Sequence, residues 1–194
     1  IRFKDEDGNR KVLNLNSIYS DFSLEDLISY KLYQREGLLA PKMELSELVI
    51  NGNYNGIKQR LENLDDDFLS RREIPLGSLY RESISSSLTA FKNWNKSDYK
   101  VTWEKQSLKK EDNFEDWIAF LQINSMALDN DDIFFRYIEK YLDIEYYLKW
   151  YAFTIMIGGV HNIDHNLVFV NDFKRQKFRQ VGYDTAGLGG NPNT

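Results

Sequence analysis

The N-terminal part of the chain shows the hydrophobic pattern of a β-hairpin followed by a helix. Two short apolar runs, residues 1–3 and 12–15, flank a polar turn with Asp-Gly at its centre, which predicts two paired strands. Apolar residues at helical spacing follow Ser23, a suitable N-cap residue, and continue towards Gly37, where the helix is expected to end.

A second hairpin is predicted in the segment that follows. Residues 44–50 and 57–61 have the apolar content of strands, and the Asn-Gly pair between them is the strongest short signal for a hairpin turn. Residues 1–82 are therefore predicted to form a strand-rich small lobe with one inserted helix. Residues 83–112 show no clear period and are predicted to be an insertion or a loop-rich linker.

The pattern turns helical in the last part of the chain, residues 113–194. Apolar residues at helical spacing predict three helices, and Asp143 is a good N-cap for the third, which a Gly-Gly pair ends. Two strand-like runs, 167–170 and 178–183, then predict a hairpin. Because alternating strand-helix units are absent, the sequence favours an α+β fold with a helix-rich large lobe over a parallel sheet.

Composition narrows the classes of protein that fit these elements. Hydrophobic residues make up 42% of the 194 residues, enough for a folded core. The net charge of -5, without a basic stripe, argues against nucleic acid as the main partner. The absence of cysteine excludes disulfide scaffolds and thiolate metal sites. The longest nearly apolar stretch, residues 150–160, is too short to span a bilayer.

Candidate chemistry is concentrated after the third predicted helix. Asn166 precedes the first strand of the predicted hairpin, and Asp184 follows the second strand, eighteen residues later. If the two strands pair, these side chains meet at one end of the hairpin, where their oxygen atoms suit Mg²⁺. Protein kinases hold their metal ions with such a pair, although Asn and Asp near strand ends also serve simply as turn formers.

The two histidines of the chain, His161 and His165, suggest a different kind of metal site. Together with Asp164 or Asp184 they would bind zinc or iron if both histidines lay on one helix face. The Gly-Gly pair before His161 is expected to end the helix first, and no Glu follows this histidine as in zinc proteases. The Mg²⁺ site therefore ranks above the zinc site.

A series of short motifs carries more information together than any one of them alone. They occupy residues 13–21, 37–42, 50–56, 61–65, 147–150, 165–166 and 183–184. In their order and spacing they resemble the CotH family of atypical bacterial protein kinases, named after spore coat protein H, across nearly the whole chain except residues 83–112. The resemblance implies a two-lobed kinase-like fold, ATP with Mg²⁺ or Mn²⁺, and phosphorylation of Ser or Thr on partner proteins such as coat or surface proteins.

The resemblance also implies roles for individual residues. Asn166 and Asp184 would be metal ligands, and Glu62 would belong to the small-lobe nucleotide site, where a carboxylate can pair with an ATP-contacting Lys. The catalytic Asp of the family, five residues before the Asn, aligns with His161. A neutral imidazole can accept a proton, so either His161 or Asp164 would approach the acceptor hydroxyl.

Departures from the family pattern leave alternatives open. With His161 at the position of the catalytic Asp, the protein is also compatible with a pseudokinase or with a non-enzymatic coat or surface interaction module. The chain starts without Met, and the expected small-lobe Lys lies before Ile1, so both natural termini are expected to lie beyond this sequence. Family resemblance allows the spore coat, the mother-cell cytoplasm or the cell surface as its location.

Overall fold

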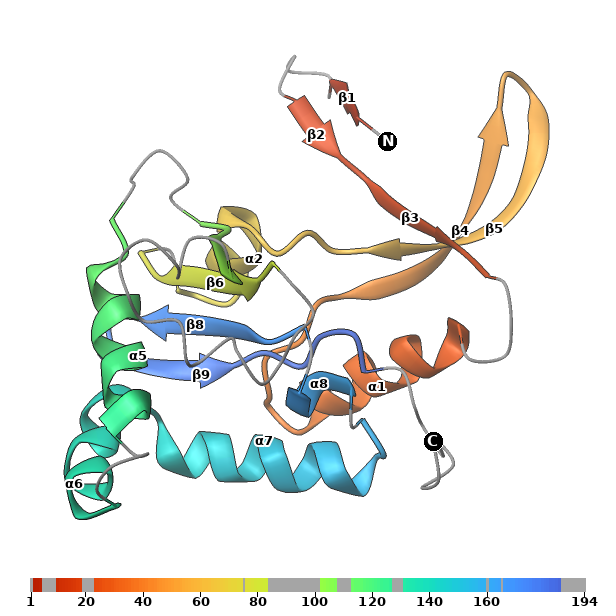
Figure 1. Ribbon diagram of the computed structural model, residues 1–194. Coiled ribbons are helices and arrows are strands. Elements are labelled where there is room, and N and C mark those ends of the chain that lie inside the picture. Colours follow the sequence, from red (N-terminus) through yellow and green to blue (C-terminus); the bar gives the residue numbers. More distant parts are fainter. Residues whose placement is uncertain are drawn as a thin grey trace.

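The computed structural model describes most of the chain, and Figure 1 shows the arrangement of its elements. The described residues are 2–4, 10–18, 23–74, 76–83, 102–107, 113–126, 131–159, 161–164 and 166–185. Their strands form antiparallel sheets of two, three and four strands, and helices accompany these sheets. The predicted α+β fold class is therefore confirmed.

The first two sheets contain the hairpins that the turn residues predicted. β1 (Arg2–Lys4) pairs with β2 (Arg10–Val12), and β4 (Met43–Ile50) pairs with β5 (Asn53–Leu61). β3 (Asn14–Ser17) pairs with the other edge of β5, so the three-stranded sheet has the order β3-β5-β4. In Figure 1 the β4–β5 hairpin extends away from the helices.

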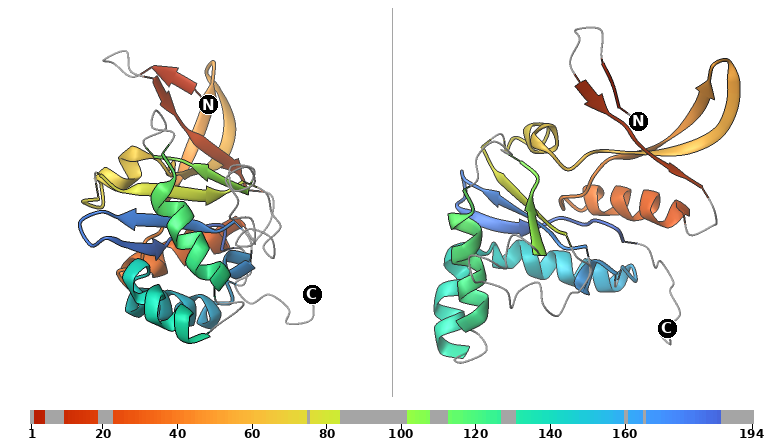
Figure 2. Two further views of the ribbon diagram at one scale, coloured as in Figure 1. Left: turned by 60° about the vertical axis from the view of Figure 1, so that its left-hand side comes forward. Right: turned by 45° about the horizontal axis from the view of Figure 1, so that its top comes forward.

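The helix α1 (Ser23–Arg35) has the bounds that the sequence predicted. It ends just before Gly37, whose φ of 72° lies in the left-handed region that favours glycine. In Figures 1 and 2, α1 lies between the three-stranded sheet and α7 (Ile144–Met156). A buried cluster joins α1 to α7 and to the segment after α1, and its members are Tyr30, Tyr33, Leu38, Ala40, Met43 and Trp150.

The four-stranded sheet combines segments that are far apart in the sequence. Its order is β7 (Trp103–Lys105), β6 (Ser78–Glu82), β8 (Val168–Asp172) and β9 (Lys177–Gln180), and all neighbours are antiparallel. β8 and β9 form the predicted C-terminal hairpin. β6, which ends the predicted small lobe, is hydrogen-bonded directly to this hairpin through β8.

Strand β7 was not predicted from the sequence. It lies within residues 83–112, which were expected to form an insertion or linker, and its three residues are too few to show a period of two. Pairing with β6, from Tyr80 opposite Lys105 to Glu82 opposite Trp103, defines it as a strand. The other parts of this stretch, residues 84–101 and 108–112, lie outside the described residues.

Both faces of the four-stranded sheet are covered. On one face, Leu79, Val168 and Val170 pack in a cluster with the short helix α2 (Asp66–Ser70) and its flanking residues. Because side chains alternate along a strand, the neighbours of these residues point to the opposite face. The sheet is thus an inner layer of the molecule.

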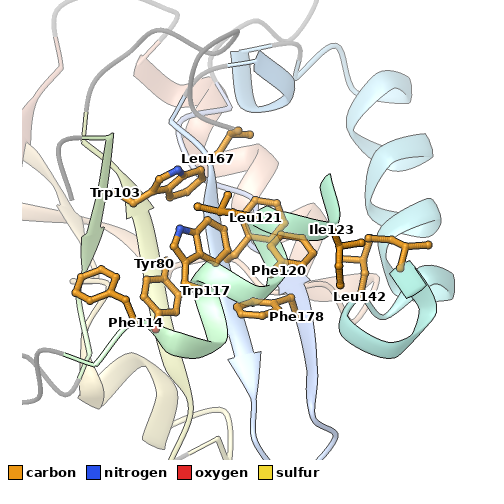
Figure 3. Close-up of a cluster of buried hydrophobic side chains, with 12 residues drawn as sticks. Tyr80, Trp103, Phe114, Trp117, Phe120, Leu121, Ile123, Leu142, Leu167 and Phe178 are labelled. Atoms are coloured by element: carbon orange, nitrogen blue, oxygen red, sulfur yellow. The ribbon is translucent and has the colours of Figure 1, made fainter. Parts of the chain in front are cut away.

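The opposite face carries an aromatic core, drawn in Figure 3. Trp117 and Phe120 of α5 (Glu115–Met126) pack against Phe178 of β9, with ring centroids 5.3 Å and 4.7 Å from its own. α6 (Asp131–Tyr141) packs beside α5 and adds Ile138 to the same core.

The three helices predicted after residue 113 are α5, α6 and α7. Asp143 caps α7 as predicted, because its carboxylate accepts a hydrogen bond from the backbone of Tyr146, and α7 ends just before Gly158. The four-residue helix α8 (His161–Asp164) follows. Within the described part of the chain, no helix combines the length and the apolar character needed to cross a membrane.

Candidate functional site

The two predicted metal ligands are in direct contact. Asn166 lies just before β8 and Asp184 lies shortly after β9, and the antiparallel pairing of these strands brings the two positions to one end of the hairpin. The side-chain amide of Asn166 donates a hydrogen bond through Nδ2 to Oδ2 of Asp184. The predicted meeting of these two side chains is therefore present in the structure.

Both residues have left-handed backbone conformations. The φ angles are 53° for Asn166 and 50° for Asp184. Asn and Asp tolerate this region better than most residues that carry a side chain, because their short polar groups can hydrogen-bond locally. The chain therefore turns sharply at both positions. The turn at Asn166 precedes β8, and the turn at Asp184 follows β9.

Helix α1 contributes two further residues that the sequence did not single out. The hydroxyl of Tyr30 accepts a hydrogen bond of 3.0 Å from the backbone N–H of Asp184. One carboxylate oxygen of Asp26 accepts hydrogen bonds from the backbone N–H of Thr185 at 2.9 Å and from its hydroxyl at 3.1 Å. Nothing in the local pattern signals these contacts, since Asp26 and Thr185 are 159 positions apart.

Two carboxylates meet at this site, and their proximity affects their chemistry. Burial raises the pKa of Asp26, and the negative charge of Asp184 raises it further, against the lowering effect of the hydrogen bonds from Thr185. Burial also raises the pKa of Tyr30 well above its usual value, with the charge of Asp26 adding to the effect, so the hydroxyl of Tyr30 stays protonated. Excess negative charge of this kind favours a cation nearby.

A pocket adjoins the site on the side of Tyr183. Its volume is about 240 Å³, and it is lined by Val12, Asn14, Glu62, Asn63, Leu64, Asp65, Arg81, Gln106 and Tyr183. The guanidinium of Arg81 lies 4.7 Å from the ring centroid of Tyr183. No carboxylate among the described residues pairs with Arg81, which leaves its charge available to an anionic ligand. Arg81 was also missed by sequence reasoning, because a single Arg in a strand carries no signal.

Glu62 lines the same pocket, and its carboxylate is fully engaged. It accepts hydrogen bonds from Arg71 at 2.6 Å, from Arg72 at 2.8 Å and from the backbone N–H of Lys42 at 2.7 Å. Among the described residues its charge partners are therefore two arginines rather than the lysine that a kinase nucleotide site would supply. For the predicted nucleotide site, the structure shows only that Glu62 lies in the wall of this pocket.

The two candidate catalytic residues lie at the ends of α8. The backbone of His161 starts this helix and that of Asp164 ends it, two residues before Asn166. Their side chains are outside the described part of the structure, as is His165 of the alternative zinc site, so these roles stay predictions. Among the described side chains, no group of three or more His, Cys, Asp or Glu residues is arranged to hold a metal ion.

The donors present fit a hard divalent cation. Asn166 has an amide oxygen and Asp184 a carboxylate, which are the ligand types that Mg²⁺ and Mn²⁺ prefer. In this structure Nδ2 of Asn166 faces Asp184, so a shared cation would require the amide to turn its Oδ1 towards the carboxylate. Because Mg²⁺ is usually held by one or two protein oxygens with water and phosphate completing its shell, two protein ligands are enough. A cation here would also relieve the repulsion between Asp184 and Asp26.

Comparison with known proteins supports the resemblance seen in the motifs. The sequence profile described as CotH kinase protein matches residues 2–193. Inner spore coat protein H of Bacillus subtilis (strain 168) is 24% identical over 182 residues, which are 91% of this chain and 49% of that protein. The chain thus spans about half the length of this curated relative. Since the profile covers almost the entire sequence, the chain belongs to the CotH kinase protein family.

Proposed function

We propose that this protein is an ATP-dependent and metal-dependent kinase that phosphorylates Ser or Thr of partner proteins, such as spore coat or surface proteins. The observation that carries the proposal is the contact between Asn166 and Asp184 in a chain of the CotH kinase protein family. The pocket beside Tyr183, with the guanidinium of Arg81 in its lining, supports it further.

Different residues would bind the metal ion and the nucleotide. Asn166 and Asp184 would hold Mg²⁺ or Mn²⁺, which when bound neutralises phosphate charge and orients the triphosphate. Arg81 adds a positive charge in the lining of the pocket, beside the ring of Tyr183. Glu62 lies in the wall of the pocket and is held there by Arg71 and Arg72, so its contribution to nucleotide binding would be to shape the site.

Phosphoryl transfer needs one further group, which α8 would supply. The acceptor hydroxyl oxygen forms a bond to the γ-phosphorus of ATP, the bond from that phosphorus to the bridging oxygen breaks, and ADP leaves. The hydroxyl proton goes to the imidazole of His161 or to the carboxylate of Asp164. Both residues lie in the short helix directly before Asn166.

A second candidate function is favoured by one specific observation. His161 stands where the family has its catalytic Asp, and a neutral imidazole cannot orient a hydroxyl through negative charge as a carboxylate does. A pseudokinase that binds nucleotide without fast transfer, or a coat or surface interaction module without nucleotide, is the corresponding alternative.

Thermal unfolding with ATP and Mg²⁺ or Mn²⁺ tests nucleotide binding. At a ligand concentration a hundredfold above Kd, the native state gains about 2.7 kcal/mol, which for this chain length raises Tm by roughly 5–10 °C. Asp184→Ala and Asn166→Ala should abolish this rise, whereas Asp131→Ala, at the exposed start of α6, should leave it intact.

Transfer of radiolabelled phosphate to casein, or to the protein itself, then separates the candidate functions. Transfer that disappears in Asp184→Ala supports the kinase. Stabilisation by nucleotide without transfer, with transfer gained in His161→Asp, supports the pseudokinase. The absence of any stabilisation under both metals would overturn the nucleotide site and leave the interaction module.

A further inference from the structure

We propose that Asp26 and Tyr30 of helix α1 are positioning residues that hold Asp184 in the orientation facing Asn166. The proposal rests on the proposed function, because it assigns these residues to the same metal site. We call the contacts of Asp26 and Tyr30 with residues 184–185 the α1 clamp. The clamp acts through the backbone of Asp184 and through Thr185, and neither Asp26 nor Tyr30 has to touch the metal or the nucleotide.

The geometry of α1 suits this role. Asp26, Tyr30 and Tyr33 are four and three positions apart, so they lie along one face of the helix. The first two receive the hydrogen bonds from residues 184–185. The ring of Tyr33 packs directly on Gly182, where an added Cβ would lie only 2.9 Å from a ring carbon. One helix face thus contacts the segment after β9 at Gly182, Asp184 and Thr185.

The backbone partners of the segment change at this point. The last ladder hydrogen bond of the hairpin joins the backbone N–H of Val181 to the carbonyl of Val168 at 2.9 Å. Beyond it, the backbone N–H groups of Asp184 and Thr185 find their partners on α1 instead of on a neighbouring strand. Because Asp184 also has a left-handed backbone, its side chain would lose its fixed direction if these contacts were removed.

Helix α1 is itself held in place by buried contacts with α7. The hydroxyl of Tyr33 is hydrogen-bonded to that of Thr154 in α7 at 2.6 Å, and both residues are fully buried. The residue after the helix turn, Leu38, is buried in the same cluster as Trp150 of α7. Since α1 is fixed to α7, it can transmit this rigidity to the site.

The carboxylate of Asp26 functions here as a hydrogen-bond acceptor. One of its oxygens accepts both hydrogen bonds from Thr185, whose side chain is completely buried. A carboxylate used in this way fixes the residue next to Asp184. Asp26→Asn can distinguish this role from that of a third metal ligand, because the substitution keeps an acceptor oxygen and removes the charge.

Amide hydrogen exchange measured by NMR on the metal-free protein tests the clamp directly. Tyr30→Phe removes only the acceptor for the N–H of Asp184, and Asp26→Ala removes the oxygen that accepts both hydrogen bonds from Thr185. Each of the two amides loses one hydrogen bond in the respective variant, which should speed its exchange by about fivefold to tenfold. Tyr151→Phe in α7 is the matched control, because it also removes one tyrosine hydroxyl but from a side chain that is 41% exposed.

Binding of Mn²⁺ in the presence of ATP, followed by electron paramagnetic resonance, gives the second readout. Tyr30→Phe and Asp26→Ala should weaken Mn²⁺ binding by about fivefold to tenfold, since the orientation of Asp184 is lost in part. Asp26→Asn should retain near wild-type binding and exchange. A loss of binding in Asp26→Asn as large as in Asp26→Ala would instead make Asp26 a metal ligand and overturn the positioning role.

Two further outcomes would overturn the clamp. Unchanged exchange at Asp184 and Thr185 in both variants would show that α1 does not hold the segment. Equal acceleration in Tyr151→Phe would show that the effect is not specific to the contacts made by α1. If the wild-type protein binds no Mn²⁺ with ATP, the proposed function fails, while the exchange measurements still decide whether the clamp exists.

Discussion

At the scale of single residues, Glu62 shows how this protein stabilises a buried charge. Its side chain is only 7% exposed, yet it contacts Arg71, Arg72 and the backbone of Lys42. Arg72 also stacks on Phe68 of α2, with 3.6 Å between its guanidinium carbon and the ring centroid. The carboxylate therefore ties α2 to the end of β5 and the start of β4, beside the pocket of the candidate site.

Replacing Glu62 with Ala should cost much of the stability of this region. The change leaves Arg72, whose side chain is 15% exposed, without a carboxylate partner, and breaking such a pair costs about 3 kcal/mol. Arg71→Ala is the matched control, because its side chain is 46% exposed and its loss should cost under about 1 kcal/mol. Urea unfolding measures both values, and equal losses would contradict the central role of Glu62.

The same carboxylate should make stability depend on pH in the acid range. Burial alone raises the pKa of Glu62, but the hydrogen bonds from Arg72, the backbone of Lys42 and Arg71 outweigh it and hold the pKa below the usual 4.5. Because the folded-state pKa is lowered, the stabilisation is present above 4.5 and is lost as the pH falls through the folded-state value. Urea unfolding at decreasing pH should show this loss, and Glu62→Gln should flatten the dependence.

At the scale of secondary-structure elements, the chain positions its site by placing α1 against the end of β9. The closest point is Gly182, which has no side chain and whose N–H donates to the carbonyl of Leu39 at 2.8 Å. The ring of Tyr33 occupies the space where a side chain at position 182 would lie. The approach of the two elements therefore depends on glycine at this position.

Gly182→Ala should destabilise the protein by about 1–3 kcal/mol, as expected for an overpacked site. The new Cβ would lie 2.9 Å from the ring of Tyr33, and this ring is fully buried and hydrogen-bonded to Thr154, so it cannot move aside freely. Gly159→Ala is the control, because its nearest contact would be 3.4 Å from a methyl group of Thr154. Urea unfolding should show the larger loss for Gly182→Ala, and combining it with Tyr33→Leu should restore part of the stability.

Elements with local determinants were predictable from the sequence. The β4–β5 turn has φ angles of 50° at Asn51 and 80° at Gly52, the conformations that an Asn-Gly pair adopts readily. The helix end at Gly37 and the cap at Asp143 depend on one residue each and were predicted for the same reason. The meeting of Asn166 and Asp184 followed from the hairpin between them, so it too was accessible.

Contacts without local determinants were not predictable. β7 is a strand because β6 pairs with it, and its three residues carry no period of their own. Asp26 and Thr185 meet only because α1 packs against the segment that follows β9, and no spacing in the sequence encodes that packing. The sequence therefore predicted that Asn166 and Asp184 meet at the end of the hairpin, but it did not predict the contacts that α1 makes with Asp184 and Thr185.

At the scale of the whole molecule, the segment after α1 connects the helices with the four-stranded sheet. The backbone N–H of Leu39 donates to the hydroxyl of Tyr146 in α7 at 2.6 Å, and that hydroxyl donates to the carbonyl of Gln180 in β9 at 3.0 Å. The carbonyl of Leu39 accepts from Gly182. One tyrosine hydroxyl thus joins three elements, so we expect α1, α7 and the β8–β9 hairpin to unfold as one cooperative unit.

Tyr146→Phe tests this cooperativity. The change removes both hydrogen bonds of the hydroxyl and leaves the N–H of Leu39 without its acceptor, which should cost about 1–3 kcal/mol. If the three elements unfold together, the urea midpoint falls while the slope m and the single transition are retained, because the same surface is exposed in one step. Tyr151→Phe, at a residue that is 41% exposed on the same helix, should change the free energy of unfolding by less than about 0.5 kcal/mol. A second transition or a lower m in Tyr146→Phe would instead mean that the sheet and the α1–α7 pair unfold separately. In that case α1 would not be rigidly fixed to the hairpin, as the α1 clamp requires.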